Sequence, residues 1–112
     1  MRWWNLREIE TPDGTRDPVV LDSEDDARAV LVSIHAGQEL GAHQVKERAW
    51  LVVVDGTVRV IAGDESRECT AGTLMMFEPG ERRSVSSDEG ARVLLLLAPW
   101  PALNHYVGET RP

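Results

Sequence analysis

Short apolar segments separated by turn-forming dipeptides are the feature that most limits the folds open to this chain. In the second half of the sequence the turn signals recur at intervals of roughly ten residues, which suits strands better than helices. The signals are Asp13-Gly14, Asp55-Gly56, Gly63-Asp64, Pro79-Gly80 and Glu89-Gly90. No segment holds a convincing helical period of apolar residues. The pattern therefore predicts an all-β chain.

The segments between these signals predict about ten strands. They are Trp3–Ile9, Val19–Asp22, Ala27–His35, Glu39–Gln44, Ala49–Val54, Thr57–Ala62, Arg67–Thr70, Leu74–Phe77, Arg82–Ser86 and Ala91–Ala98. Asp55-Gly56 is the strongest hairpin signal, because both central positions of a type I′ turn need the positive φ that these residues tolerate. Pro79-Gly80 suits the central positions of a type II turn.

Length and charge exclude several classes of protein. The 112 residues predict one compact domain over 1–112, since so short a chain leaves no length for a second core. Twelve basic and nineteen acidic residues give a net charge of −7 without a Lys/Arg cluster, which argues against a nucleic-acid partner. No apolar run approaches the roughly 18 residues of a membrane span, and no signal-peptide core is present, so we expect a cytoplasmic protein. The single Cys69 is interpreted as a structural thiol.

Two predicted strands are apolar on both faces. Residues 50–54 and 93–97 lack the polar alternation of a strand that is half exposed to solvent, so each must be covered on its second face. Trp3, Trp4 and Trp50 are aromatic residues of the kind that interfaces collect. We therefore expect a homodimer; a monomer with Trp3 and Trp4 folded over its own sheet is the alternative.

Two groups of residues resemble the conserved motifs of the cupin family. Gly37, His43, Val45, Ala49 and Gly56 have the spacing of the first motif, and the segment from Ala71 to Arg83 resembles the second. The resemblance covers Val30 to Ala98, with the short inter-motif segment of small bacterial cupins. It implies a double-stranded β-helix, or jelly-roll barrel, over about 27–98, followed by a C-terminal tail at 99–112.

The metal site that the resemblance would imply is largely missing. The family takes two histidines and a glutamate from the first motif and a histidine from the second, and those places hold His43, Val45, Ala49 and Arg83. One of four ligands is left, so we expect no metal and no cofactor. Further donors near in sequence have no motif position, namely His35, Glu47, Glu78 and His105.

Arg83 is the polar residue that the side-chain period directs into the barrel. It shares a strand face with Val85, while its neighbours in sequence occupy the opposite face. A guanidinium in an apolar interior needs compensation. It pairs either with Glu47 or Glu78, or with a carboxylate or hydroxyl of a ligand held between Arg83 and His43.

Three functions remain open. The first is a metal-free protein that binds a small polar or anionic molecule as a sensor, carrier or accessory protein. His43 and Arg83 would bind the ligand, and Val45 and Ala49 would line the pocket. The second is a metal-independent isomerase or epimerase, with His43 as general acid or base and Arg83 orienting an anionic substrate. The third is a metal-dependent enzyme with an unusual ligand set. Whether the chain is an enzyme stays open.

Overall fold

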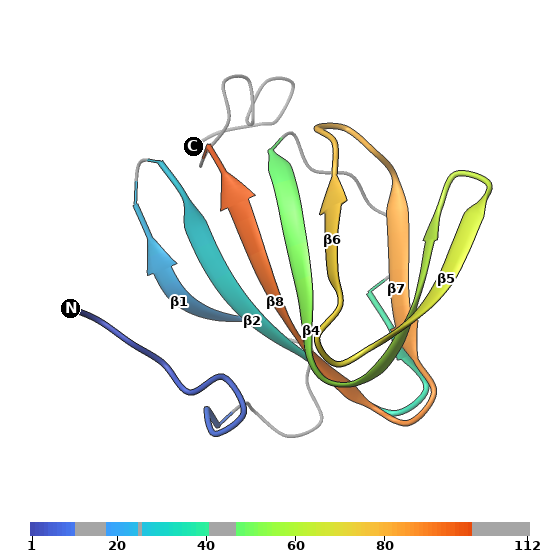
Figure 1. Cartoon of the computed structure of the whole chain (residues 1–112), viewed down its shortest axis with the longest axis horizontal. Coiled ribbons are helices and arrows are strands. Elements are labelled where there is room, and N and C mark those ends of the chain that lie inside the picture. The colour runs from blue at the N-terminus through green and yellow to red at the C-terminus, as the bar shows by residue number, and fades with distance from the viewer. Residues whose placement is uncertain (11–17, 25, 41–46, 100–112) are drawn as a thin grey trace, which may run out of the picture.

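The computed structural model of the chain describes residues 1–10, 18–24, 26–40 and 47–99, and these residues form strands and turns (Figure 1). The strands are β1 (Val19–Ser23), β2 (Arg28–Ile34), β3 (Gln38–Glu39), β4 (Arg48–Ala62), β5 (Glu65–Thr70), β6 (Leu74–Phe77), β7 (Arg83–Ser87) and β8 (Ala91–Ala98). The all-β prediction is confirmed for these parts of the chain. They contain no helix with the length and apolar character that crossing a bilayer requires.

All strand pairs are antiparallel, and β4 belongs to both of the sheets that they form. Its first half pairs with β8 and β6 in a sheet that continues through β2 to β1. Its second half pairs with β5 and β7 in the other sheet, which ends at β3. The result is a curled, half-open barrel, whose curvature is visible in Figure 1.

The predicted hairpin at Asp55-Gly56 is wrong, because the chain continues through these residues as one strand. Gly56 does adopt the positive φ that the dipeptide suggested, 80°, and it lies opposite Ala91 of β8. The register of β4 against β8 shifts between Val53 and Asp55, which marks a bulge. The glycine therefore redirects β4 from one sheet into the other.

Two further expectations have different outcomes. The Pro79-Gly80 turn is confirmed, since Gly80 has a φ of 80° and the amide of Glu81 donates to the carbonyl of Glu78 at 3.0 Å.

The strand predicted at residues 3–9 is wrong. That segment joins no sheet, and side chains hold it instead: Arg2 donates to Asp22 at 2.8 Å, and Arg92 donates to the Leu6 carbonyl at 2.8 Å.

The core lies between the two sheets and follows the two-residue period of the strands. In β4 the buried residues include Ala49, Leu51 and Val53, which alternate with more exposed neighbours. Cys69 of β5 is also buried, and its Sγ lies 3.7 Å from the sulfur of Met75. The inner faces of the barrel are thus almost wholly apolar, and the polar side chains found there require an explanation.

Candidate functional site

Arg83 is a charged residue on the inner face of the barrel. It begins β7 directly after the 78–82 turn and lies opposite Ala62 of β4. Its exposed fraction is 3%, and it shares its face with the buried residues Val85 and Ser87. The predicted inward direction of Arg83 is confirmed by this burial.

The Arg83 guanidinium is stacked on an aromatic ring. Its Cζ lies 4.8 Å from the centre of the Phe77 ring, within the range of a cation–π interaction. The buried Nε and Nη1 atoms have no hydrogen-bond partner within the part of the chain that the structure describes. Ser87, in contrast, donates to the carbonyl of Thr57 at 2.7 Å. Two donors of Arg83 are therefore available to another acceptor.

Burial lowers the pKa of the Arg83 guanidinium from its usual range, and the carboxylate of Glu81 acts in the opposite direction. A guanidinium nevertheless stays protonated in proteins. The group is therefore a permanent positive charge whose burial opposes folding. The shift moves the pKa in the direction expected when desolvation outweighs the attraction of nearby acids.

The prediction that Glu78 compensates Arg83 is wrong. Glu78 instead accepts a hydrogen bond from Arg48 at 3.1 Å, in a pair of exposed side chains where Arg48 begins β4 and Glu78 directly follows β6. Two further ion pairs join Arg2 to Asp22 and Arg67 to Glu65. None of these pairs includes Arg83.

Glu47, which was predicted as one possible partner of Arg83, is a buried acid. It directly precedes β4 and has an exposed fraction of 0%. An acid just before a strand is ordinarily exposed. The two-residue period that buries Ala49 and Leu51 extends backward to Glu47, so the strand pattern itself held the missed signal.

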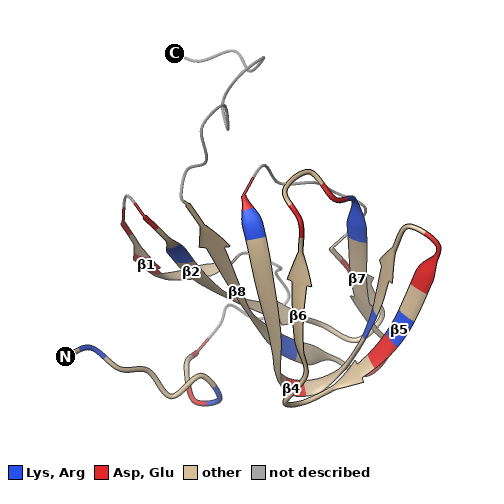
Figure 2. Ribbon diagram, turned by 45° about the horizontal axis from the view of Figure 1, so that its top comes forward, with Lys and Arg blue, Asp and Glu red and all other residues tan. Residues whose placement is uncertain are grey.

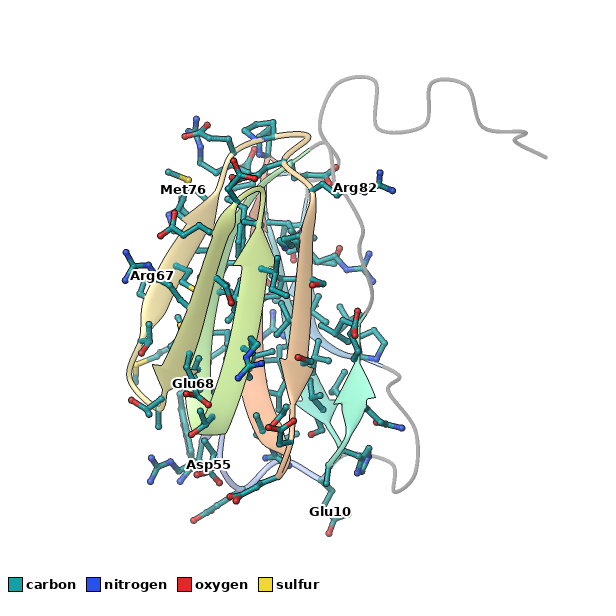
Figure 3. All side chains as sticks on the ribbon, turned by 90° about the vertical axis from the view of Figure 1, so that its right-hand side faces the viewer. Glu10, Asp55, Arg67, Glu68, Met76 and Arg82 are labelled. Carbon is teal, nitrogen blue, oxygen red and sulfur yellow. The ribbon has the colours of Figure 1, made fainter. Side chains whose placement is uncertain are left out.

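A cavity of about 180 Å³ opens between the edge strands β5 and β6. It is lined by Val60, Ala62, Met75, Met76 and Phe77, with Glu65, Arg67 and Glu81 at its rim. Arg83 does not itself line the cavity, but two of its neighbours do: Phe77, the ring on which it stacks, and Ala62, its cross-strand partner. Arg67 and Met76 project from the same side of the molecule (Figure 3).

Two other clefts are larger, about 210 and 350 Å³, and lie toward the end of the barrel marked by Asp55 and Glu68 in Figure 3. The smaller of the two is lined mainly by exposed polar residues, including Arg59, Asp88 and Glu89. Neither is lined by Phe77 or Ala62, the residues that adjoin Arg83. The apolar cavity with one buried cation beside it has the usual composition of a small-molecule site.

The residues at the cupin ligand positions do not fit a metal ion. Ala49 is fully buried opposite Phe77 and offers only a methyl group, and Arg83 brings a positive charge. Val45 has no donor atom, and both Val45 and His43 lie outside the described residues, as does His105. Across the described ranges, no group of three or more His, Cys, Asp or Glu side chains is placed to hold a metal. His35 and Glu78 therefore do not rebuild the site there.

The fold matches solved structures closely although the sequences have diverged. A protein with a double-stranded β-helix domain from Klebsiella pneumoniae has a TM-score of 0.79 at 21% identity, with 92% of this chain and 94% of that chain covered. An RmlC-like cupin from Desulfovibrio desulfuricans has a TM-score of 0.78 at 22% identity, with 88% of this chain and 97% of that chain covered. A cupin superfamily protein from Desulfitobacterium hafniense has a TM-score of 0.76 at 12% identity, with 83% of this chain and 85% of that chain covered.

No protein-family model matches the sequence, and no curated protein matches it. The structural likenesses confirm the double-stranded β-helix that the two motifs implied, so the chain has the cupin fold. At these identities the likeness extends to the fold alone. Function must therefore be argued from the site.

Proposed function

We propose that this cupin-fold chain is a metal-free cytoplasmic protein that binds a small polar or anionic molecule at Arg83, as a sensor, carrier or accessory protein. The observation that carries the proposal is the buried guanidinium with two donors that lack a partner among the described residues. A ligand carboxylate or hydroxyl would accept from these donors and compensate the charge. His43 is the second proposed contact, although it lies outside the described residues.

The cavity beside Arg83 supports a ligand of limited size. Its volume is about 180 Å³, and a cavity of about 150 Å³ accommodates a benzene molecule. Val60, Met75 and Phe77 would pack against the hydrocarbon part of the ligand. Arg83, which stacks on Phe77 without lining the cavity itself, would hold the polar group of the ligand. We therefore propose a small organic acid, or a hydroxylated molecule of similar size.

A thermal-shift screen of small carboxylates and sugars tests this function. For a true ligand at about 100 times its Kd, we expect the wild type to gain about 2.7 kcal/mol of stability. The gain should disappear in Arg83→Met and persist in Arg82→Met, because Arg82 is exposed and points away from the barrel (Figure 3). A screen with no wild-type hit, or a hit that Arg83→Met retains, would contradict the proposal.

We also expect the purified protein to retain far less than one transition-metal ion per chain after dialysis. The physical reason is that Ala49 and Val45 supply no lone pair, while the Arg83 charge repels a cation. Elemental analysis measures this directly. About one iron, zinc, nickel or manganese per chain, lost in His43→Ala, would instead support a metal-dependent enzyme with an unusual ligand set.

The isomerase or epimerase alternative assigns acid and base chemistry to His43. That residue lies outside the described ranges, so no contact within them favours catalysis over binding. The screen also separates these two functions: a hit that the wild type converts into a product, and that His43→Ala binds without converting, would identify an enzyme.

A further inference from the structure

A buried acid and a buried cation lie toward the same end of the barrel. Glu47 is fully buried and directly precedes β4, and Arg83, with an exposed fraction of 3%, begins β7. β4 and β7 start at the same end of the barrel, with β6 between them (Figure 1). Charged residues of both signs mark the starts of these two strands (Figure 2). Among the described residues, Glu47 and Arg83 are the charged side chains that are buried.

Phe77 connects the two charged residues with the cavity. Its ring lines the cavity and lies 4.8 Å from the Cζ of Arg83. Its Cα is paired with that of Ala49 in β4. Glu47 lies two residues before Ala49 on the same face of the strand, a distance of about 7 Å along the chain. Both charged residues are therefore placed close to one aromatic residue that also borders the cavity.

Two donors of Arg83 are not satisfied by Glu47. The Nε and Nη1 atoms of Arg83 have no hydrogen-bond partner among the described residues, which include Glu47. A molecule held between the two side chains must accept hydrogen bonds from Arg83 and donate hydrogen bonds to Glu47. The Glu47 carboxylate can accept several hydrogen bonds at once, so a ligand ammonium group needs only part of its capacity. An α-amino acid carries a carboxylate and an ammonium group on one carbon atom and so meets both requirements.

The balance of charge favours an amino acid over a simple carboxylic acid. A simple carboxylate at Arg83 would bring a second anion close to Glu47, in an interior where the low dielectric constant strengthens the repulsion of like charges. The ammonium group of an amino acid would instead pair with Glu47 while the carboxylate pairs with Arg83. Such a ligand adds no net charge to the interior of the barrel.

We propose that the small molecule bound by this chain is an α-amino acid with an apolar side chain. Arg83 holds its carboxylate, and Glu47 holds its ammonium group. The side chain of the ligand packs in the cavity of about 180 Å³, against Val60, Met75 and Phe77. A cavity of about 150 Å³ accommodates a benzene molecule, so side chains from that of valine to that of phenylalanine are of suitable size. This inference rests on the proposed function and narrows its class of ligand.

Calorimetric titration of the wild type with matched molecules tests the proposal. The probes are valine, leucine, methionine and phenylalanine in both enantiomers, the corresponding acids that lack the ammonium group, and the corresponding amines that lack the carboxylate. We expect at least one amino acid to bind about 100-fold more tightly than its acid and its amine. The reason is that each analogue leaves one buried charge of the protein without its partner.

Two variants test the role of Glu47. In Glu47→Gln the amino acid should bind no more tightly than the acid without the ammonium group, because the neutral amide cannot compensate the ligand charge. Glu78→Gln is the matched control. Glu78 is an exposed acid that directly follows β6 and pairs with Arg48, so its replacement should leave the affinity for the amino acid unchanged.

The comparison of probes on the wild type needs no variant, so it decides the matter even if Glu47→Gln does not fold. Acids that bind as tightly as the amino acids would overturn the inference and leave the proposed function in place. A preference for the amino acid that folded Glu47→Gln retains would do the same. If no amino acid binds, the inference also falls, and a hit among the other carboxylates or sugars of the thermal-shift screen would still support the proposed function.

Discussion

Replacement of Gly56 by alanine should lower the free energy of unfolding by at least about 3 kcal/mol. A Cβ atom at this position would lie 2.3 Å from the carbonyl oxygen of Gly90 and 2.9 Å from the Cα of Ala91. Both are backbone atoms of the neighbouring chain segment, so neither can move aside as a flexible side chain would. Relief of the clash requires β4 and β8 to separate where β4 changes sheets, and the φ of 80° adds its own cost.

Gly63 and Gly72 provide the matched controls for this prediction. Their φ values are 61° and 94°, yet an added Cβ would meet nothing within 4 Å. Alanine at either position should therefore cost only the 1 to 2 kcal/mol, roughly, of a left-handed backbone. Urea denaturation of the three variants measures the difference. Equal losses at all three positions would show that φ, and not the close approach of β8, determines the role of Gly56.

Arg83→Met should raise the free energy of unfolding of the ligand-free protein by about 1 to 2 kcal/mol. Desolvation of a buried ion costs several kcal/mol, whereas a desolvated cation–π contact such as that with Phe77 returns about 2 kcal/mol. Methionine fills a comparable volume and makes favourable contacts with an aromatic ring. Denaturation at one fixed protein concentration is the appropriate measurement, because association also contributes to stability.

The opposite result would identify Arg83 as a structural residue. If its charge compensates the buried Glu47, removal of the guanidinium should cost about 3 kcal/mol or more by leaving an acid in the interior. Arg82→Met is the control, and it should change stability by no more than about 0.5 kcal/mol because Arg82 is exposed. A loss in Arg83→Met together with no wild-type ligand would remove the basis of the proposed binding site.

Local patterns were read most reliably from the sequence. The strand at Ala91–Ala98 was predicted with its observed bounds, and the inward direction of Arg83 followed from its shared face with Val85. The first depends on an apolar segment bounded by a turn signal and the second on the two-residue period of a strand, and both are local properties of the sequence. The Asp55-Gly56 dipeptide correctly predicted a positive φ at Gly56, but the predicted hairpin was wrong. A glycine with positive φ serves a hairpin and a bulge equally well, and the neighbouring strand that distinguishes them is distant in sequence.

The polar partners in the site could not be predicted for a related reason. Glu78 pairs with Arg48, and not with Arg83, because β4 and β6 are neighbours and bring these two long side chains to the same rim. The order of the strands in the sheet decides which arginine Glu78 meets. That order cannot be read from the residues near Glu78 in the sequence. The burial of Glu47 could have been predicted, because the two-residue period of buried side chains in β4 places Glu47 on the inner face when it is extended backward from Ala49.

The sharing of β4 by both sheets bears on how the molecule loses its structure. This strand pairs with β5, β6, β7 and β8, so neither sheet can unfold while the other keeps all of its inter-strand hydrogen bonds. Partial opening is then confined to strands whose departure leaves β4 in place, such as β1 or β3 at the ends of the sheet order. The rest of the described barrel unfolds as one cooperative unit. The strands on both sides of the cavity near Arg83 are therefore expected to unfold in the same transition.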